Sequence, residues 1–243
     1  MKRIAKKTVV AMAFLIAVGT AWAAQPVSES IPVGPGVEVD IDVLSGTVTI
    51  LAGSSGVVEV TGTLGDGVES LEIDGDEDGV YIEVEYDEHY HGKHQTDTDL
   101  TIRVPAGSAL TVETVSASIS VDGVTGELDL ESVSGGVDVT TMPAALDVET
   151  VSGNISVASA PADSDLSSVS GKIEIQAAGG SIDVENVSGK TTIYGGVIDD
   201  GDLESVSGDI TCHAMPGPDG SLDIETMSGV ITLVIDSTLV GSF

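Results

Sequence analysis

Basic residues are almost missing from this 243-residue chain beyond its first 24 positions. Those positions hold four of the eight Lys and Arg residues and no acidic one, so residues 25–243 carry 40 acidic against four basic residues, a net charge of −36. A surface that binds nucleic acid or an anionic membrane must be basic, which excludes both partners. The charge indicates either a salty habitat, where screening weakens self-repulsion, or binding of divalent cations.

Cysteine and aromatic residues are also scarce. The single Cys, Cys212, excludes an intramolecular disulfide, and aromatic residues make up only 3% of the chain. The core must therefore be narrow and built from branched aliphatic side chains. Cys212 occupies an aliphatic position of the repeat described below, which favours a buried small hydrophobe over a catalytic thiol. Its neighbour His213 would point to the opposite face of a strand.

The first 24 residues have the pattern of a secretory signal peptide. A basic start precedes an apolar stretch at residues 9–18 and the small-x-small pattern Ala21-Trp22-Ala23. A transmembrane helix is the alternative, but the apolar run is too short for one. No Cys follows the run, so we expect no lipid anchor, and no later segment is apolar enough to span a membrane. We therefore expect the mature chain in the periplasm, or secreted or on the cell surface.

An 18-residue repeat fills the second half of the chain. Residues 146–157 read L-D-V-E-T-V-S-G-N-I-S-V, and close copies begin at Leu128, Ile182 and Leu222. Apolar and polar residues alternate within each copy, which is typical of β-strands. A short fixed period with this alternation predicts an all-β fold, a single parallel β-solenoid (β-helix) of coils of about 18 residues.

Residues one period apart should stack about 4.8 Å apart, so whole columns can be predicted. Two aliphatic columns are expected to form the core: Val112, Leu130, Val148, Leu166, Val184, Leu203 and Ile224, and Val121, Val139, Val157, Ile175, Ile193, Cys212 and Leu233. A third column precedes the recurrent Ser: Val115, Val133, Val151, Val169, Val187, Val206 and Met227. We place it at a corner beside the core, where Val151→Asp would be severely destabilising.

A column of glycines follows the recurrent Ser and is interpreted as a repeated corner that requires positive φ. Its members are Gly135, Gly153, Gly171, Gly189, Gly208 and Gly229.

The phrase also occurs once near the N-terminus, at residues 36–50. Alternating segments follow at 57–64, 71–74, 80–86 and 100–104, with a hairpin-type turn from Gly75 to Gly79. We interpret residues 25–109 as a β-rich capping region with a first coil and a hairpin insertion. Residues 110–243 would form the repeat solenoid, and the whole of 25–243 one continuous domain. Such a cap protects strand edges from aggregation.

The order of these segments resembles the bacterial DUF4097 "putative adhesin" family, related to the head GIN domain proteins. A first coil with a Ser-Gly corner leads to a β insertion, then to L-T-I-R-V-P-A-G at residues 100–107, then to repeated S-V-S-G coils. The resemblance covers nearly all of the chain after residue 24. It implies a β-helix with an envelope or secreted location and brings no catalytic residues. The chain departs from the pattern at residues 237–243, where relatives usually run on into another coil.

Two rows of carboxylates are the main candidates for chemistry. They are Asp129, Asp147, Asp165, Asp183, Asp202 and Asp223, and Glu113, Glu131, Glu149, Glu185, Glu204 and Glu225. Both rows should share an outward face, where like charges about 4.8 Å apart repel by roughly 1 kcal/mol per pair even in water. Bridging Ca²⁺ would relieve the repulsion, whereas a halophilic protein would tolerate it in salt. The calcium motif G-G-x-G-x-D is absent, and Thr111 and Ser167 interrupt the rows.

A second candidate is the group His89, His91 and His94, a possible Zn²⁺ or Cu²⁺ site. The spacing H-x-H-x-x-H matches no strong zinc motif, so an exposed polar hairpin tip is the alternative. Whether this group or the carboxylate rows bind metal stays open.

Support for catalysis is slight, so we predict no catalytic and no cofactor-binding residues. Arg103 is the only Arg after the signal segment, and the carboxylates are evenly spread, not gathered as glycan cleavage requires. We expect an exported, non-enzymatic acidic solenoid, an adhesin-like surface or periplasmic protein with a structural or interaction role. A calcium-responsive carboxylate ladder and a polysaccharide-active β-helix enzyme are the alternatives.

Overall fold

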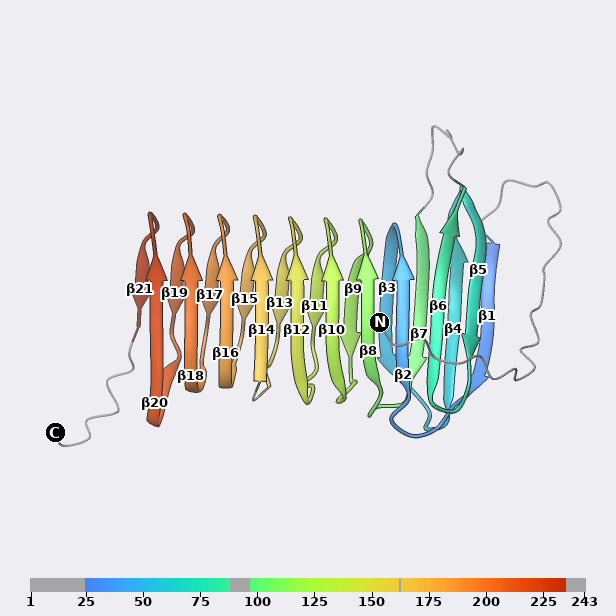
Figure 1. The fold of residues 1–243 in the computed structure, drawn as a ribbon, viewed down its shortest axis with the longest axis horizontal. Helices are drawn as coiled ribbons and strands as arrows, with labels where there is room; N and C mark the ends of the chain where they lie inside the picture. Colours follow the sequence, from blue (N-terminus) through green and yellow to red (C-terminus); the bar gives the residue numbers. More distant parts are fainter. Residues whose placement is uncertain (1–24, 88–96, 162, 235–243) are drawn as a thin grey trace, which may run out of the picture.

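The computed structural model describes residues 25–87, 97–161 and 163–234, and within these ranges the chain is all-β with no helix (Figure 1). The strands form two long sheets that face each other across the core, one of eleven strands and one of ten. The eleven-stranded sheet contains β1 (Gln25–Pro32), β3 (Gly46–Ala52), β4 (Val57–Leu64), β7 (Thr98–Val104), β9 (Ser118–Asp122), β11 (Val137–Val139), β13 (Ile155–Val157), β15 (Ile173–Ile175), β17 (Thr191–Ile193), β19 (Ile210–Cys212) and β21 (Ile231–Leu233). The ten-stranded sheet contains β2 (Glu38–Val43), β5 (Val68–Gly75), β6 (Gly79–Tyr86), β8 (Ala109–Thr114), β10 (Glu127–Ser132), β12 (Ala145–Thr150), β14 (Asp163–Ser168), β16 (Ala178–Asn186), β18 (Gly196–Ser205) and β20 (Met215–Thr226).

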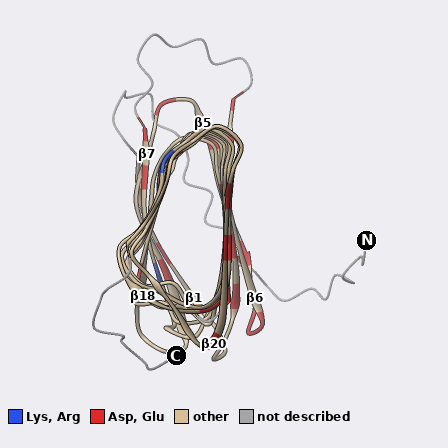
Figure 2. Ribbon diagram, turned by 90° about the vertical axis from the view of Figure 1, so that its left-hand side faces the viewer, with Lys and Arg blue, Asp and Glu red and all other residues tan. Residues whose placement is uncertain are grey.

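From β8 onward each coil gives one strand to each sheet, and successive coils stack in parallel. β10 pairs with β8 and β12, and β11 pairs with β9 and β13. The register places Leu130 opposite Val112 on one side and Val148 on the other, as the period of 18 requires. Viewed along the axis, the coils superpose as a flattened oval (Figure 2). The predicted parallel β-solenoid is confirmed.

The two predicted aliphatic columns lie in the core, together with further columns such as Leu110, Leu128 and Leu146 and Ile119, Val137 and Ile155. Val112 to Leu203 in one column and Val121 to Cys212 in the other are buried. Cys212 is fully enclosed and burial raises the pKa of its thiol, while His213 is exposed, as expected from strand alternation. In the last described coil Ile224 is only partly buried and Leu233 is exposed. Among the described residues no further coil covers that end.

The N-terminal strands depart from the order of the chain. The predicted first coil is present as β2 and β3, and β2 pairs directly with β8, and β3 with β9. On its other side lie β6 and β7, which come later in the sequence but stack in parallel on β2 and β3. The first coil in the sequence is therefore the second of the parallel coils in space.

Antiparallel pairing closes this end of the solenoid. β5 and β6 form the hairpin expected around residues 75–79, and β1 pairs with β4, which in turn pairs with β7 (Figure 1). The outermost strand β1 carries Pro26 and Pro32, and β5 carries Glu69, Glu72 and Asp74. Proline and charge on an edge strand oppose pairing with a further chain.

The interpretation of the glycine column was wrong in its cause. None of its six members has a positive φ; the corresponding glycine of the first coil, Gly46, does, at 120°. The column requires glycine because successive backbones come very close at the corner. A Cβ on Gly153 would lie 1.9 Å from the carbonyl oxygen of Gly135, and one on Gly171 would lie 1.7 Å from that of Gly153.

The placement of the valine column beside the core was also wrong. Val151 is 49% exposed, and the column from Val115 to Val206 is exposed to a similar extent. The alternation of the strand simply continues through the corner. Thr150 turns inward, where its Oγ1 donates a hydrogen bond to the carbonyl oxygen of Gly153 at 3.0 Å, so Val151 must turn outward. The severe effect predicted for Val151→Asp loses its basis.

Candidate functional site: an acidic face and a corner groove

The outer face of the ten-stranded sheet carries the predicted rows of carboxylates in register. Asp129 pairs with Asp147, Asp147 with Asp165, and the row continues without a break to Asp223. All six side chains are exposed. The prediction that the Asp and Glu rows share one outward face is confirmed, since Glu131 and Glu149 lie in register on the same strands and are also exposed.

The Glu row extends beyond the repeats to the far end of the sheet. Asp42 of β2 pairs with Glu113 of β8 and with Glu83 of β6, and Glu83 pairs with Glu72 of β5. The sequence alone missed this extension. The alternation on β2 was a usable signal, but β5 and β6 join the row only because the chain folds back outside its first coil.

Basic residues are absent from this sheet. None of its ten strands contains Lys, Arg or His. The Lys and Arg residues that the structure describes lie elsewhere: Arg103 is on β7, and Lys172 and Lys190 follow corner glycines on the side of the other sheet. Lys172 is paired with Glu174 there. Figure 2 shows the acidic positions gathered along the edge of the oval that carries β6 and β20.

The stacking raises the pKa values of several carboxyls. The pKa of Asp147 rises from 3.8 to about 6, chiefly through partial desolvation and then through repulsion from Asp165 and Asp129. Desolvation and neighbouring carboxylates also raise the pKa values of Glu131 and Asp183. Each added negative charge is opposed by its neighbours, so the face is electrostatically strained at neutral pH.

Beyond Asp129 and Thr111, the column of the Asp row continues through Asp40, Tyr81 and Asp74. There the Tyr81 hydroxyl stands between two carboxylates. It donates a hydrogen bond to the Glu83 carboxylate at 2.9 Å. Desolvation, this hydrogen bond and nearby carboxylates raise the pKa of Tyr81 to about 12.

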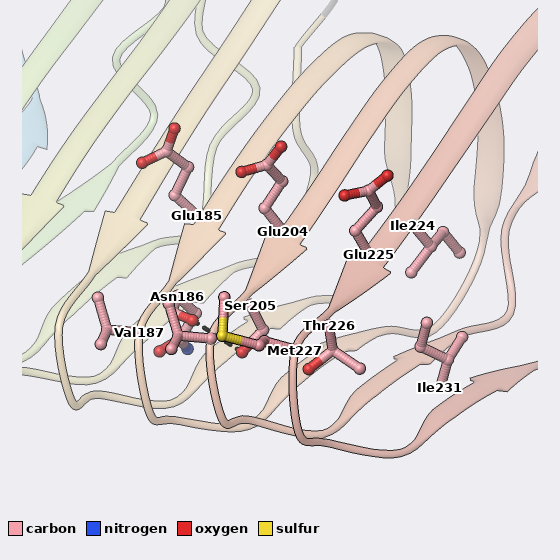
Figure 3. Close-up of a pocket in the computed structure, with 11 residues that line it drawn as sticks. Glu185, Asn186, Val187, Glu204, Ser205, Ile224, Glu225, Thr226, Met227 and Ile231 are labelled. Atoms are coloured by element: carbon pink, nitrogen blue, oxygen red, sulfur yellow. Dashed lines mark hydrogen bonds between the residues drawn. The ribbon is translucent and has the colours of Figure 1, made fainter.

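A groove follows the corner where the ten-stranded sheet ends. One part, of about 580 Å³, runs from Asp42 and Glu113 to Glu185 and Val187. A second, of about 600 Å³, starts at the same Glu185 and Val187 and continues to Met227 (Figure 3). The two parts share these residues and so form one channel along the axis. We call it the corner groove.

The corner groove has two unlike walls. One is the Glu row, and Figure 3 shows Glu185, Glu204 and Glu225 side by side on successive strands. The other is the exposed aliphatic column from Val115 to Met227. Between them lies a floor of small polar side chains: Thr114, Ser132, Thr150, Ser168, Asn186, Ser205 and Thr226.

Hydrogen bonds fix the floor and the outer edge of the corner. Ser132 Oγ accepts from the Gly135 amide at 2.9 Å and receives the Thr114 hydroxyl at 2.9 Å. On the outside, the Ser152 hydroxyl donates to the carbonyl oxygen of Val133 in the preceding coil at 3.2 Å, and Ser170 to that of Val151. These bonds, repeated along the solenoid, explain the T-V-S-G phrase and hold both walls in place.

The hairpin of β5 and β6 brings Glu85 close to Glu72 and Glu83 of the Glu row. Ligand atoms of Glu72, Glu83 and Glu85 all lie within 4.8 Å of one another. Ser70 Oγ donates a hydrogen bond to Glu85 at 2.5 Å. The residues His89, His91 and His94 lie outside the described part of the chain, so the predicted histidine site stays a prediction.

Comparison with known families identifies the fold. The family model described as Toastrack DUF4097 matches residues 37–241, so the chain belongs to this family, as its segment order suggested. Among curated proteins none matches the chain.

Among solved structures one has a similar overall fold, and others match the chain less well. A structure described as a "putative adhesin" from Bacteroides fragilis has a TM-score of 0.55 at 12% identity and covers 87% of this chain and 97% of that one. Another described in the same words, from Parabacteroides distasonis, has a TM-score of 0.44 at 18% identity and covers 87% and 97%. A third, described as a "putative lipid binding protein" from the same organism, has a TM-score of 0.39 at 13% identity and covers 86% and 97%. At 12% identity the Bacteroides fragilis structure supports a similar fold and nothing about function.

Within the described residues no helix is long and apolar enough to cross a membrane.

Proposed function

We propose that this chain is an exported, adhesin-like β-solenoid that acts by binding through its acidic face and not by catalysis. The observation that carries the proposal is the continuous row from Asp129 to Asp223 on a sheet without a single basic residue. A rigid scaffold that repeats one charge at a fixed spacing is suited to a partner that repeats the opposite charge.

The location rests on the sequence and on the resemblance. The basic, apolar and small-x-small pattern of residues 1–24 favours export, with the mature chain beginning near residue 25. The name of the Bacteroides fragilis structure is consistent with a surface role. We place the mature protein in the periplasm, on the cell surface or in the medium.

A binding role is favoured over turnover by the distribution of the carboxylates. Glycoside cleavage needs an acid and a base gathered about one bond. Here the groups repeat evenly, with Asp147 between two equivalent neighbours, Asp129 and Asp165. Even spacing does not gather an acid and a base about one bond.

The test compares two variants that each remove two charges. One carries Asp147→Asn and Asp165→Asn on the ten-stranded sheet; the control carries Asp122→Asn and Asp138→Asn on the eleven-stranded sheet. Beads coated with each purified protein are applied to isolated envelopes of the native host, and retention is counted. We expect the first variant to lose retention and the control to keep it.

Equal retention by both variants would remove the acidic face from the proposal. Fractionation of the host tests the location, and a cytoplasmic pool of uncleaved protein would contradict export. Glycan cleavage that disappears on changing one Asp or Glu would contradict the non-enzymatic role.

A calcium-responsive ladder is the second candidate, favoured by the proximity of Glu72, Glu83 and Glu85. Carboxylate oxygens are the ligands that Ca²⁺ prefers. Calorimetric titration with Ca²⁺ in molar NaCl distinguishes a calcium site from a merely acidic face, because salt screens diffuse attraction but not direct coordination. Saturable heat that Glu83→Gln abolishes would support a calcium site. A melting temperature that rises with NaCl alone would favour the halophilic interpretation.

A further inference from the structure

We infer that the corner groove is a docking site for a basic amphipathic α-helix lying along the solenoid axis. The inference rests on the proposed binding function and names the partner class and the surface. Its starting point is that the groove joins two kinds of row: carboxylates such as Glu149, interrupted at Ser167, and half-exposed aliphatic side chains such as Val151, which run from Val115 to Val206.

The aliphatic row lies outside the buried core. Val133 is 45% and Val169 47% exposed, although the neighbouring outward positions of the corner are filled by hydrogen-bonded serines such as Ser152. Isolated exposed valines are ordinary, but a continuous row beside a row of like charges forms an apolar stripe with a polar rim. Such a stripe suits a partner that is itself apolar on one side.

The negative charge of the Glu row indicates which residues the polar side of the partner should carry. Lys172 and Lys190, which follow the corner glycines, are not among the residues that line the groove. Partial desolvation and then neighbouring carboxylates raise the pKa of Glu131, and repulsion from Asp202 followed by desolvation raises that of Glu204. Lys or Arg side chains of a partner would neutralise this row while their aliphatic stems cover the valines.

The spacing selects a helix over an extended strand. Coils repeat every ~4.8 Å along the groove. A helix repeats its apolar stripe every ~5.4 Å, so over the five steps from Val115 to Val206 it falls out of step by about 3 Å. An extended chain repeats one face every ~6.7 Å, so its mismatch with the coils is about 1.9 Å at each step, against about 0.6 Å for the helix. A helix of about 16 residues spans these five steps.

The test uses a synthetic peptide of about 17 residues, with Leu at helical spacing on one side and Lys along its flank. Two controls have the same composition: a scrambled peptide, and one in which Lys and Leu alternate strictly. Binding to the purified protein is followed by fluorescence anisotropy of labelled peptide, and helix formation by circular dichroism. We expect the amphipathic peptide to bind at least roughly tenfold more tightly than either control and to gain helix on binding.

Protein variants separate the two walls. Val133→Ser with Val151→Ser and Val169→Ser removes apolar surface and keeps every charge; we expect affinity to fall roughly tenfold. Glu131→Gln with Glu149→Gln should weaken binding and flatten its dependence on salt. The pair Asp122→Asn and Asp138→Asn on the other sheet is the control and should bind as the wild type does. Melting curves establish that each variant is folded, and the peptide comparison on wild-type protein needs no variant.

Equal binding of the scrambled peptide, or full affinity in the valine-to-serine variant, would overturn the inference, because charge alone would then explain the binding. Preference for the alternating peptide would also overturn it, in favour of an extended partner. If no peptide binds but the beads still need Asp147 and Asp165 for retention, the helix inference fails and the proposed function stands. If the beads show no such need either, both fail.

Discussion

The outer faces of the two sheets have the same coil spacing but differ in the residues that point outward. Both cover the same core at the same coil spacing. On the eleven-stranded sheet the central outward column contains two carboxylates among eight positions: Thr49, Ser120, Asp138, Ser156, Glu174, Thr192, Thr211 and Thr232. On the ten-stranded sheet the corresponding column from Asp40 to Asp223 has carboxylates at seven of eight positions, Thr111 being the exception.

The difference shows that the solenoid does not need the acidic rows. Ser and Thr are adequate outward residues for stacked strands, and they avoid the desolvation and repulsion that raise the pKa of Asp147 to about 6. Adaptation to salt alone would place acidic residues on both faces. The concentration of charge on one face is therefore better explained by a partner on that side, which is the basis of the proposals above.

The largest effect is expected at the corner that joins the two faces. A Cβ on Gly135 would lie 1.7 Å from the carbonyl oxygen of Ala117, whereas one on Gly136 would come no closer than 3.5 Å, to the carbonyl oxygen of Asn154. Gly135→Ala should cost more than about 3 kcal/mol of unfolding free energy, and Gly136→Ala less than about 1 kcal/mol. Urea denaturation of the pair measures both, and equal losses would show that close stacking is not what the corner requires.

Next in size is the contrast between inside and outside on one coil. Leu130 is fully buried and Val133 is 45% exposed. Leu130→Ala should cost about 2–5 kcal/mol through the cavity it leaves, and Val133→Ala about 0.5 kcal/mol or less. Denaturant midpoints provide the comparison. A large loss at Val133 would mean that the valine row is a structural element and would weaken its assignment to a binding surface.

Neutralising carboxylates on one face should raise the stability of the fold, whereas the two substitutions above lower it. Asp147→Asn with Asp165→Asn removes repulsion along the row, by at most roughly 1 kcal/mol per adjacent pair before screening. We expect a higher melting temperature at low ionic strength and no difference in molar NaCl. The pair Asp122→Asn and Asp138→Asn, on the other face, should change little in either condition. A gain of equal size on both faces would erase the proposed asymmetry.

Acidification should also stabilise the fold. The folded-state pKa of Asp147 is about 6, above its usual 3.8, so the folded state binds the proton more tightly than the unfolded chain does. That stability is complete below about pH 4 and is lost as the pH rises through about 6; the raised pKa values of Asp40, Asp42 and Asp183 act in the same direction.

We therefore expect a higher melting temperature at pH 5 than at pH 8 in low salt. The shift should be roughly 2–4 °C for each kcal/mol of repulsion relieved. Asp147→Asn should reduce the difference. A melting temperature that falls steadily on acidification would show that the carboxylates are stabilised, not strained, in the folded state.

The smallest effect is expected for Val151→Asp. The side chain is 49% exposed and leaves no cavity when replaced, so the loss should be within about 0.5 kcal/mol. Thermal melting in high salt measures it free of the added repulsion from Glu149. A loss as large as that of Leu130→Ala would restore a core role for this column.

Much of this architecture follows from the sequence because it depends on two short-range periods. Alternation within a strand decides which side chains face inward, and the period of 18 decides which ones stack. Together they were enough to predict the columns through Leu130 and Val121, the exposure of Asp147 and Glu149, and the burial of Cys212. The same local rule explains why Val151 is exposed once Thr150 is known to turn inward.

The tertiary structure decided the contacts between segments that neither the strand alternation nor the 18-residue repeat relates. β6 and β7 stack outside the first coil, and only this places Glu83 and Glu72 at the end of the Glu row. The glycine column reflects how closely two coils approach at the corner, which a φ preference cannot reveal. The corner groove likewise exists only when the coils are stacked, because each coil supplies at most one carboxylate and one aliphatic side chain to its walls, and a continuous wall needs several coils.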